Sequence, residues 1–419
     1  MSNTIPTPPC DEFDPDNLNV EQARARMLAS VAAVVGIERL ALRDALDRVL
    51  AADVISPINV PPYANSAMDG YAVVGSDLPS DDEKALTLIG AAFAGAPFEG
   101  EVKTGKCIRI MTGAPLPTGA DTVIMQEHVR AEDTTITLGP GHSQGQNVRH
   151  IGEDLRAGKP VLSAGKKIGP AELGLLASLG TPEVSVYRKL RVVFFSTGDE
   201  LRSVGEPLGE GQIYDSNRYT LYGMLKRLHV EVIDMGVIPD QRAAVEQAFI
   251  EAAAIGDAII TSGGVSVGEA DFVKDTLAKL GSVDFWKINM KPGKPLAFGK
   301  IGQAVFFGLP GNPVSVMATF YQFALPTLKA MMGQSQTVPV SMKVPCKSLL
   351  KKRPGRTDFQ RGILAYDDQG QLLVDGAGMQ ASHVLSGMSR ANCFIVLPLE
   401  AGNVEAGSLV EVQPFEGLV

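Results

Sequence analysis

The feature that most constrains the fold is a regular alternation of strand-like and helix-like segments between residues 191 and 332. Strands are predicted for the apolar runs RVVFFST (191–197), VEVIDMG (230–236), DAIITSG (257–263), VDFWKIN (283–289) and AVFFGLP (304–310). Helical periodicity marks residues 217–228, 241–254, 271–280 and 312–332. Strands and helices that alternate in this way predict an α/β domain, with a parallel or mostly parallel sheet and helices on both faces.

Shorter elements are predicted on either side of this domain. Asn19 can cap a helix that runs to about Val35, with Gln22 in position to complete a capping box. Residues 65–149 hold short apolar runs separated by Gly, Pro and Asp, which predict a β-rich module, and a helix is expected near 170–179. After Met332 the runs MKVPC, FQRGILAY, QLLVDG, CFIVLP and SLVEVQP predict a small C-terminal barrel or sandwich.

Composition narrows the classes of protein. The length of 419 residues suggests two to four domains, and 45% hydrophobic with 20% charged residues is typical of a soluble globular protein. The net charge of −9 argues against a nucleic-acid partner, which needs a basic face, and no two cysteines have CxxC spacing. The first residues lack a secretory signal and no apolar run reaches membrane-spanning length, so we expect a cytoplasmic protein without a membrane partner.

Two glycine-rich loops follow predicted strands of the α/β domain. SGGVSVGEAD (262–271) lies between a strand and a helix, and GLPGNPVS (308–315) opens the long helix. Glycines let backbone N–H groups approach a ligand, and the amino end of a helix favours negative charge, so the two loops suggest a site for a phosphorylated molecule. Either loop alone can equally be a tight turn. Neither has the spacing of a P-loop or of a dinucleotide-binding motif.

Basic residues lie near the second loop and in the C-terminal region. Lys287, Lys291 and Lys294 fall in the turn WKINMKPGKP (286–295), where they are suited to neutralise an oxyanion or phosphates. A solvated loop is the simpler alternative, and spacing alone slightly favours it. In GRTDFQRG (355–362), Arg356 and Arg361 flank a strand start, where they either contact phosphate or are exposed.

Carboxylates recur where predicted strands end or helices begin, at Asp199, Glu200, Asp215, Asp240 and Asp271. If the sheet is parallel, these loops meet at one edge, where the acids could share a divalent cation with the phosphates of a ligand. A single Asp at such a position is more often a helix N-cap. The metal hypothesis therefore rests on the group and not on any one residue.

Eight segments, taken in order, resemble those of the molybdopterin molybdenumtransferase (MoeA) family, which includes the E domain of gephyrin. They are NSAMDGYAV, RIMTGAP, STGDEL, GQIYDSN, TSGGVSVGEAD, KPGKPLAFG, GLPGNPVS and GRTDFQRG. The resemblance extends from about residue 20 to the C-terminus. Ala64 and Phe272 depart from the residues common in the family, and neither touches the chemistry assigned below.

The resemblance implies an elongated homodimer with four domains in each chain. These are a discontinuous N-terminal domain (18–64 and 150–185), an inserted β-rich domain (65–149), a doubly wound α/β domain similar to molybdopterin adenylyltransferases (186–335), and a C-terminal β-barrel-like domain (336–419). It also implies an enzyme that inserts molybdate into adenylylated molybdopterin and releases AMP and molybdenum cofactor, with Mg²⁺ as the divalent cation. A separate molybdopterin adenylyltransferase is a candidate partner.

Carried over residue by residue, the resemblance assigns two sets of positions. The catalytic set is Asp69, Thr112, Glu200, Asp240, Asp271, Lys287 and Lys291, of which Glu200, Asp240 and Asp271 would hold the metal. The cofactor-binding set is Gly263, Gly264, Ser266, Gly268, Lys294, Gly308, Pro310, Gly311, Asn312, Arg356 and Ser382. In a dimer of this family, the segments around Asp69 and Thr112 reach the α/β site of the partner subunit.

Two other functions fit parts of the sequence. A molybdopterin adenylyltransferase shares the glycine loops but has no need of NSAMDG, MTGAP or a C-terminal β domain. A gephyrin-like scaffold would need a receptor-binding groove, which no segment of this sequence marks.

Overall fold

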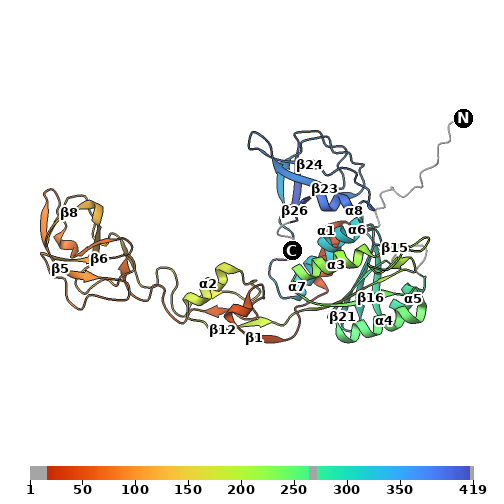
Figure 1. The fold of residues 1–419 in the computed structure, drawn as a ribbon, viewed down its shortest axis with the longest axis horizontal. Coiled ribbons are helices and arrows are strands. Elements are labelled where there is room, and N and C mark those ends of the chain that lie inside the picture. The colour runs from red at the N-terminus through yellow and green to blue at the C-terminus, as the bar shows by residue number, and fades with distance from the viewer. Residues whose placement is uncertain (1–16, 264–270, 416–419) are drawn as a thin grey trace.

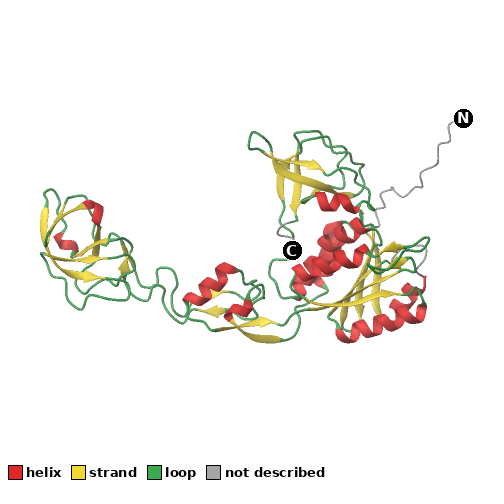
Figure 2. Cartoon of the chain, in the orientation of Figure 1, coloured by secondary structure: helices red, strands yellow, loops and turns green. Residues whose placement is uncertain are grey.

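The computed structural model describes residues 17–263 and 271–415 and is elongated (Figure 1). An α/β domain and a C-terminal β domain lie together, and a narrow arm leads from them to a second β domain at the far end (Figure 1). Most of the helical residues gather in the α/β domain, whereas strands dominate the arm and the far domain (Figure 2). No helix in the described ranges is long and apolar enough to span a membrane.

The α/β domain is built on a six-stranded sheet in the order β16-β13-β17-β21-β20-β18. Its first four strands are parallel: β13 (Arg191–Thr197), β16 (Glu231–Ile238), β17 (Ala258–Ser262) and β21 (Ala304–Leu309). The antiparallel strands β20 (Pro295–Ile301) and β18 (Gly281–Lys287) close one edge. The predicted mostly parallel sheet is confirmed, and β20 is a strand that the sequence pattern did not predict.

Helices cover both faces of this sheet because alternate side chains of each strand point to opposite faces. On β13, Val193 and Phe195 face the layer of α4 (Arg242–Ile255) and α5 (Asp271–Leu280). Phe194 packs on the other side, in the core that includes α1 (Val20–Ala29), α3 (Ser216–Arg227), α6 (Pro313–Thr319) and α7 (Leu325–Met331). The buried π-helical turn η4 (Phe320–Ala324) joins α6 to α7, so these three elements form the long predicted helix.

The C-terminal β domain shares a sheet with the α/β domain. All five predicted runs form strands: β22 (Met342–Pro345), β23 (Thr357–Tyr366), β24 (Leu372–Gly376), β25 (Cys393–Leu397) and β26 (Leu409–Pro414). The sheet begins with β19 (Met290–Lys291), which comes from the α/β domain and pairs with β23. Helix α8 (Leu385–Arg390) contacts α6 and β23. These contacts hold the C-terminal domain beside the loops of the α/β domain.

The far β domain contains a six-stranded sheet in the order β7-β4-β6-β5-β9-β8. Its strands are β4 (Gly70–Val73), β5 (Lys84–Ala92), β6 (Lys106–Ile110), β7 (Thr122–Met125), β8 (Val129–Glu132) and β9 (Thr135–Leu138). Short 3-10 turns lie at η2 (Gly75–Asp77) and η3 (Gln126–His128). The predicted β-rich module is therefore present, with sheet strands from Gly70 to Leu138, and its bounds at residues 65 and 149 stay a prediction.

The arm is formed by short antiparallel pairs. β1 (Ile37–Ala41) pairs with β12 (Glu183–Tyr187), β2 (Val54–Ile55) with β11 (Pro160–Leu162), and β3 (Asn65–Ser66) with β10 (Val148–Arg149). Helix α2 (Pro170–Ser178) and the 3-10 turn η1 (Leu42–Ala45) pack beside the first pair. Each pair joins an outgoing stretch of chain to a returning one, which explains why the arm is narrow (Figure 1).

Helix α1 is shorter than predicted. Asn19 caps it, and Gln22 completes the capping box as expected, but the helix ends at Ala29 instead of Val35. Beyond this point the chain turns toward the arm, and Val34 donates its N–H to the carbonyl of Met331 at 2.8 Å instead of extending the helix. A tertiary hydrogen bond thus replaces the local one that the apolar pattern suggested.

Candidate active site

The parallel strands of the α/β domain bring several predicted site residues to one edge. Asp199 and Glu200 follow β13, Asp240 follows β16, and Gly263 follows β17. The segment Pro310–Asn312 follows β21 at the same edge. Ligands of open α/β sheets bind outside the carboxyl ends of the strands, so this edge is the candidate site.

The first glycine loop starts with a position that only glycine suits. Gly263 has φ +90°, and a Cβ atom there would lie 3.0 Å from the carbonyl oxygen of Thr197. Its N–H donates to the carbonyl of Leu309 at 3.2 Å, which ties this loop to the end of β21. Gly264, Ser266 and Gly268 lie outside the described residues. Asp271 begins α5, but its side chain is also outside the description.

The second loop is held by contacts from two other parts of the fold. Gly308 is the penultimate residue of β21, and Asn312 is the N-cap position of α6. The carbonyl of Gly311, which follows Pro310, accepts a hydrogen bond from Nδ2 of Asn217 at 2.7 Å. Val314, in the first turn of α6, donates its N–H to the carbonyl of Ser382 at 3.1 Å. Ser382 of the C-terminal domain therefore lies beside the glycine loop.

An open cavity of about 590 Å³ lies beside the ends of β13 and β16, and its lining includes Asp199 but neither Glu200 nor Asp240. Asp199 borders it and accepts the N–H of Asp240 on Oδ1 at 3.1 Å, which links the ends of the two strands. Glu200 and Asp240 are both exposed. Across residues 17–263 and 271–415, no group of three His, Cys, Asp or Glu side chains is arranged to hold a metal ion. Two of the three expected metal ligands are described, and they are hard oxygen donors of the type Mg²⁺ prefers.

Asp215 caps a helix, which was the alternative to a metal-binding role for the acids at these positions. It is the N-cap of α3, and its Oδ1 accepts the N–H of Arg218 at 3.0 Å. Arg218 in turn binds both carboxylate oxygens of Asp234, at 2.8 and 2.9 Å. The N-cap alternative is thus confirmed for Asp215.

A basic pocket of about 490 Å³ lies between the turn after β18 and the C-terminal domain. Lys291 and Arg356 both line it, because β19 pairs in register with the start of β23. The other lining residues are Lys351, Lys352, Arg353, Pro354, Asp358 and Asn403. The excess of cations over the single carboxylate makes this pocket suited to an oxyanion or a phosphate.

The remaining predicted lysines are placed differently. Lys287 ends β18 and is exposed, and it is not among the residues that line the basic pocket. Lys294 is half-buried, and its carbonyl accepts the N–H of Ile288 at 2.8 Å, which closes the turn. Burial lowers the pKa of Lys352, whose ammonium donates to the carbonyls of Arg353, Leu399 and Ala401. Lys352 thus stabilises the wall of the pocket, because its ammonium group is already hydrogen-bonded to these three carbonyl groups.

A second cluster lies in the far β domain. The backbone N–H and the hydroxyl of Thr112 both donate to Oδ1 of Asp69, each at 2.7 Å. These two hydrogen bonds hold the pKa of Asp69 below its ordinary value, the backbone bond having the larger effect. Arg109 donates to the carbonyl of Gly70 at 3.0 Å and lies over the ring of Tyr71. The predicted pair Asp69 and Thr112 is therefore brought together next to β6, which lies at the opposite end of the arm from the α/β domain (Figure 1).

Comparison with known proteins identifies the family to which the chain belongs. Family models match three successive parts: the MoeA N-terminal region (domain I and II) over residues 18–180, a "probable molybdopterin binding domain" over 194–330, and the MoeA C-terminal region (domain IV) over 343–415. A molybdopterin molybdenumtransferase of Haemophilus influenzae is 51% identical over 404 residues, covering 96% of this chain and 100% of that protein. The chain belongs to the MoeA family.

Two further relatives support the family fold. The molybdopterin biosynthesis moeA protein from Pyrococcus horikoshii OT3 has a TM-score of 0.82 at 28% identity, with 96% of this chain and 100% of that chain covered. Gephyrin of Dictyostelium discoideum is 32% identical over 426 residues, which cover 90% of this chain and 59% of gephyrin. The predicted family and its multidomain α/β and β-rich fold are both confirmed.

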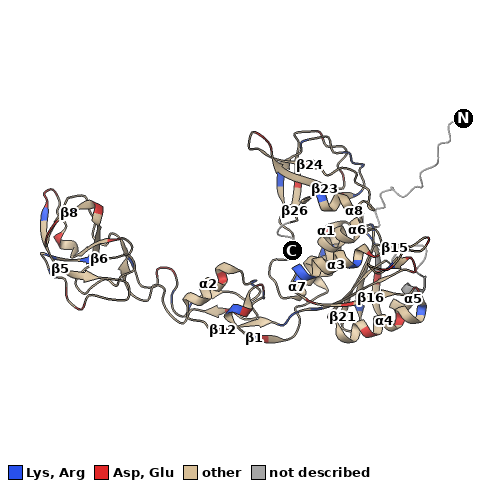
Figure 3. Ribbon diagram, viewed as in Figure 1, with Lys and Arg blue, Asp and Glu red and all other residues tan. Residues whose placement is uncertain are grey.

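Lysines, arginines and acids are scattered over all domains in Figure 3, whereas four of the five cations that line the basic pocket come from one run, KKRPGR (351–356). Lys351 and Arg353 are pocket residues that the sequence interpretation missed. The run KKRPGR was the available signal, but only its last arginine falls within a family segment.

Arg361 contradicts both alternatives raised for it. It is fully buried, and its Nη2 donates to the carbonyls of Met379 at 2.6 Å and Ala381 at 3.3 Å. It therefore neither contacts phosphate at the surface nor lies exposed. The guanidinium holds the segment that leads into Ser382, which in turn contacts α6.

Proposed function

We propose that this MoeA-family chain is a molybdopterin molybdenumtransferase, which inserts molybdate into adenylylated molybdopterin and releases AMP and the molybdenum cofactor. The observation that carries the proposal is the basic pocket formed by Lys291 and Arg356 beside the carboxyl edge of the α/β sheet. One substrate is an oxyanion and the other carries phosphates, and both need cations and N–H donors.

The chain's own residues divide the work between binding and orientation. Lys291 and Arg356 would bind anionic oxygens, and Lys287 and Lys294 would contribute charge from the same turn. The backbone of the two glycine loops would approach the pterin phosphate, with Ser382 against the second loop. A separate molybdopterin adenylyltransferase would supply the adenylylated substrate.

Glu200, Asp240 and Asp271 would hold a divalent cation, for which Mg²⁺ is the natural choice with carboxylate ligands. Such a cation, when bound, would neutralise the phosphoanhydride and make AMP a better leaving group. The carboxylates alone would repel a phosphate-bearing ligand, since like charges a few ångströms apart repel strongly in a partly desolvated site. The acids of this edge therefore fit the reaction as cation ligands.

A second copy of the chain would complete the site. Asp69 precedes β4 and Thr112 follows β6, and these strands belong to the β domain at the far end of the arm, away from the α/β domain of the same chain (Figure 1). We propose a homodimer in which this pair reaches the α/β edge of the partner subunit. Two-fold symmetry would then produce two equivalent composite sites.

Molybdate-dependent release of AMP from adenylylated molybdopterin, followed by chromatography, tests the activity directly. The composite site is tested by mixing Asp69→Ala and Asp271→Ala, each expected to be inactive on its own, after subunit exchange. Random exchange makes about half the dimers mixed, each with one intact site, so about a quarter of the wild-type activity is expected. Co-purification of the two variants, each carrying a different affinity tag, shows that exchange has occurred. Activity of the exchanged mixture that never exceeds that of the single variants would then refute the two-subunit site.

A further inference from the structure

Two stretches of backbone join the arm to the α/β domain. Residues 30–36 lead from α1 outward into β1, and residues 188–190 lead from β12 back into β13. We call this junction the joint. Any rotation of the arm relative to the α/β domain has to take place there, because the paired strands stiffen the arm on one side and the sheet is fixed on the other.

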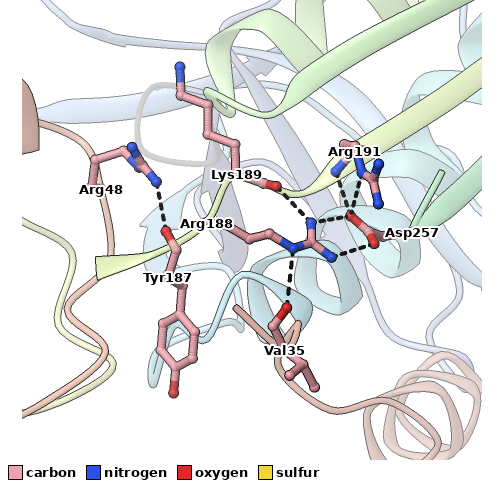
Figure 4. Close-up of polar contacts among 7 residues, drawn as sticks. All are labelled: Val35, Arg48, Tyr187, Arg188, Lys189, Arg191 and Asp257. Carbon is pink, nitrogen blue, oxygen red and sulfur yellow. Dashed lines mark hydrogen bonds and ion pairs between the residues drawn. The ribbon is translucent and has the colours of Figure 1, made fainter. Parts of the chain in front are cut away.

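One arginine contacts both stretches and anchors them to the sheet (Figure 4). Nε of Arg188 donates to the carbonyl of Val35 at 3.2 Å, and Nη1 donates to the carbonyl of Lys189 at 3.0 Å. The same guanidinium binds Asp257 with two hydrogen bonds of 2.7 Å. Asp257 directly precedes β17, in the centre of the α/β sheet, so the paired charges fasten the joint to a central strand of the domain.

Asp257 is also tied to the returning stretch. Its carboxylate accepts the N–H of Arg191, the first residue of β13, at 2.8 Å. Burial favours the neutral form of Asp257, but the hydrogen bonds and charge of Arg188 outweigh it and keep the pKa of Asp257 below its ordinary value. The side chains of Arg188 and Asp257 are 27% and 15% exposed. A bidentate pair of this kind restricts orientation as well as distance.

The backbone under Arg188 is shaped to receive it. Gly36 has φ +135°, and a Cβ atom there would lie 2.9 Å from Cδ of Arg188. The carbonyl of Gly36 accepts the N–H of Arg188 at 3.0 Å. The side chain of Arg188 therefore lies across the outgoing stretch, and a larger residue at position 36 would displace it.

Other contacts at the joint hold the arm without fixing both stretches. Asp47 of the arm pairs with His229 beside α3 at 3.4 Å, and both side chains are well exposed to water. Ser335 donates its N–H to the carbonyl of Gly165 in the arm at 3.1 Å. Exposed ion pairs contribute little because water screens them, so the Asp47–His229 pair does little to set the angle of the arm. The Ser335 hydrogen bond reaches neither of the two stretches of the joint.

We propose that Arg188 and Asp257 are positioning residues that fix the direction of the arm and thereby place Asp69 at the active site of the partner subunit. This inference rests on the two-subunit site proposed above. The far β domain lies at the end of a long lever (Figure 1), so a small rotation at the joint moves Asp69 much further than it moves the joint itself. Catalysis is sensitive to displacements of about 1 Å in such a group.

The test measures the distance between the two arms of a dimer together with the kinetics. A nitroxide is attached at Glu99→Cys, an exposed position of the far β domain, in a Cys10→Ser background; Cys107, Cys346 and Cys393 are buried. The distribution of distances between the two nitroxides of a dimer is recorded by pulsed electron–electron double resonance for wild type, Arg188→Ala and Asp257→Asn. Arg130→Ala, which breaks the exposed Arg130–Glu83 pair of the far domain, is the matched control.

Arg188→Ala is expected to broaden the distance distribution at least about two-fold and to lower kcat about ten-fold or more, with KM for molybdate within about two-fold of wild type. Asp257→Asn keeps one side-chain oxygen as an acceptor for Arg188, so it should show a smaller change in distance width and in kcat, in the same direction. If Arg188→Ala does not fold, Asp257→Asn is the variant that tests the inference. If both variants keep the wild-type width of the distance distribution and the wild-type kcat, this inference is wrong, while the two-subunit site is unaffected. A wild type that gives no arm-to-arm distance overturns the two-subunit site and this inference together.

Discussion

Thr112 donates two hydrogen bonds to a single oxygen of Asp69, one from its backbone nitrogen and one from its hydroxyl, each at 2.7 Å. Asp69 follows the NSAM segment and Thr112 follows β6, so the contact joins two family segments that are 43 residues apart. Both donors stabilise the ionised carboxylate. The pair therefore presents a fixed negative charge at the exposed end of the arm.

The pH dependence of activity should report this contact. Thr112→Val removes the hydroxyl donor but keeps the backbone donor and the shape, so the pKa of Asp69 should rise toward its ordinary value. A carboxylate with a lowered pKa stays ionised to lower pH, so raising that pKa should move the acidic limb of kcat/KM to higher pH. A ¹³C titration of the Asp69 carboxyl group checks the cause, with Thr118→Val, at an exposed threonine of the same domain, as control. Identical titration in Thr112→Val and wild type would contradict the assignment.

Binding of molybdate should depend on the lysine and arginine that line the basic pocket. Lys291→Ala and Arg356→Ala are each expected to weaken molybdate binding about ten-fold, which is about 1.4 kcal/mol, because each removes a charged donor to the oxyanion. Lys287→Ala should have a smaller effect, since Lys287, unlike Lys291, lies outside the pocket lining. Isothermal titration calorimetry with molybdate measures all three.

Lys103→Ala is the control for loss of one positive charge, because Lys103 pairs only at the surface of the far β domain, at 3.4 Å from Glu101. Equal losses in Lys103→Ala and Lys291→Ala would mean that net charge, and not the pocket, governs binding. If Lys291→Ala binds molybdate with the wild-type affinity, Lys291 belongs to a solvated loop and does not bind the oxyanion.

Much of the fold follows from local signals in the sequence. The change from short apolar runs to alternating strands and helices located the α/β domain, and the capping box of Asn19 and Gln22 located the start of α1. Strand β20 escaped notice because Pro295 and Gly299 interrupt its pattern. Gly299 is required there by tertiary contact, since a Cβ atom would lie 2.1 Å from the carbonyl oxygen of Ser282 on the neighbouring strand.

The site could be predicted only in part, for physical reasons. Burial of Lys352 and Arg361 runs against their residue types, and it depends on carbonyl groups supplied by segments far away in the chain. The pairing of β19 with β23, which brings Lys291 to Arg356, has no local signal at all. Asp69 and Thr112 were found through the family resemblance, because a turn such as NSAMDG has no chemistry of its own.

The acids at the sheet edge lead to a prediction about metal dependence. Asp199 links the ends of β13 and β16 by accepting the N–H of Asp240, and Asp271 begins α5 after the first glycine loop. Asp215 shows that an acid at such a position can serve as a helix cap alone. The two roles can be separated at Asp271, because Asn caps a helix as well as Asp does but lacks the charge that a divalent cation needs.

Asp271→Asn should slow the release of AMP from bound adenylylated molybdopterin by about ten-fold or more, because one ligand charge to the cation is lost. Binding of the adenylylated pterin should hold or tighten, since the substitution also removes a negative charge near its phosphates. Single-turnover AMP release over a range of Mg²⁺ concentrations measures both effects, and added Mg²⁺ should recover part of the rate. Asp284→Asn, on exposed β18, is the control. If Asp271→Asn releases AMP at the wild-type rate with molybdate present, the metal role assigned to Asp271 is wrong.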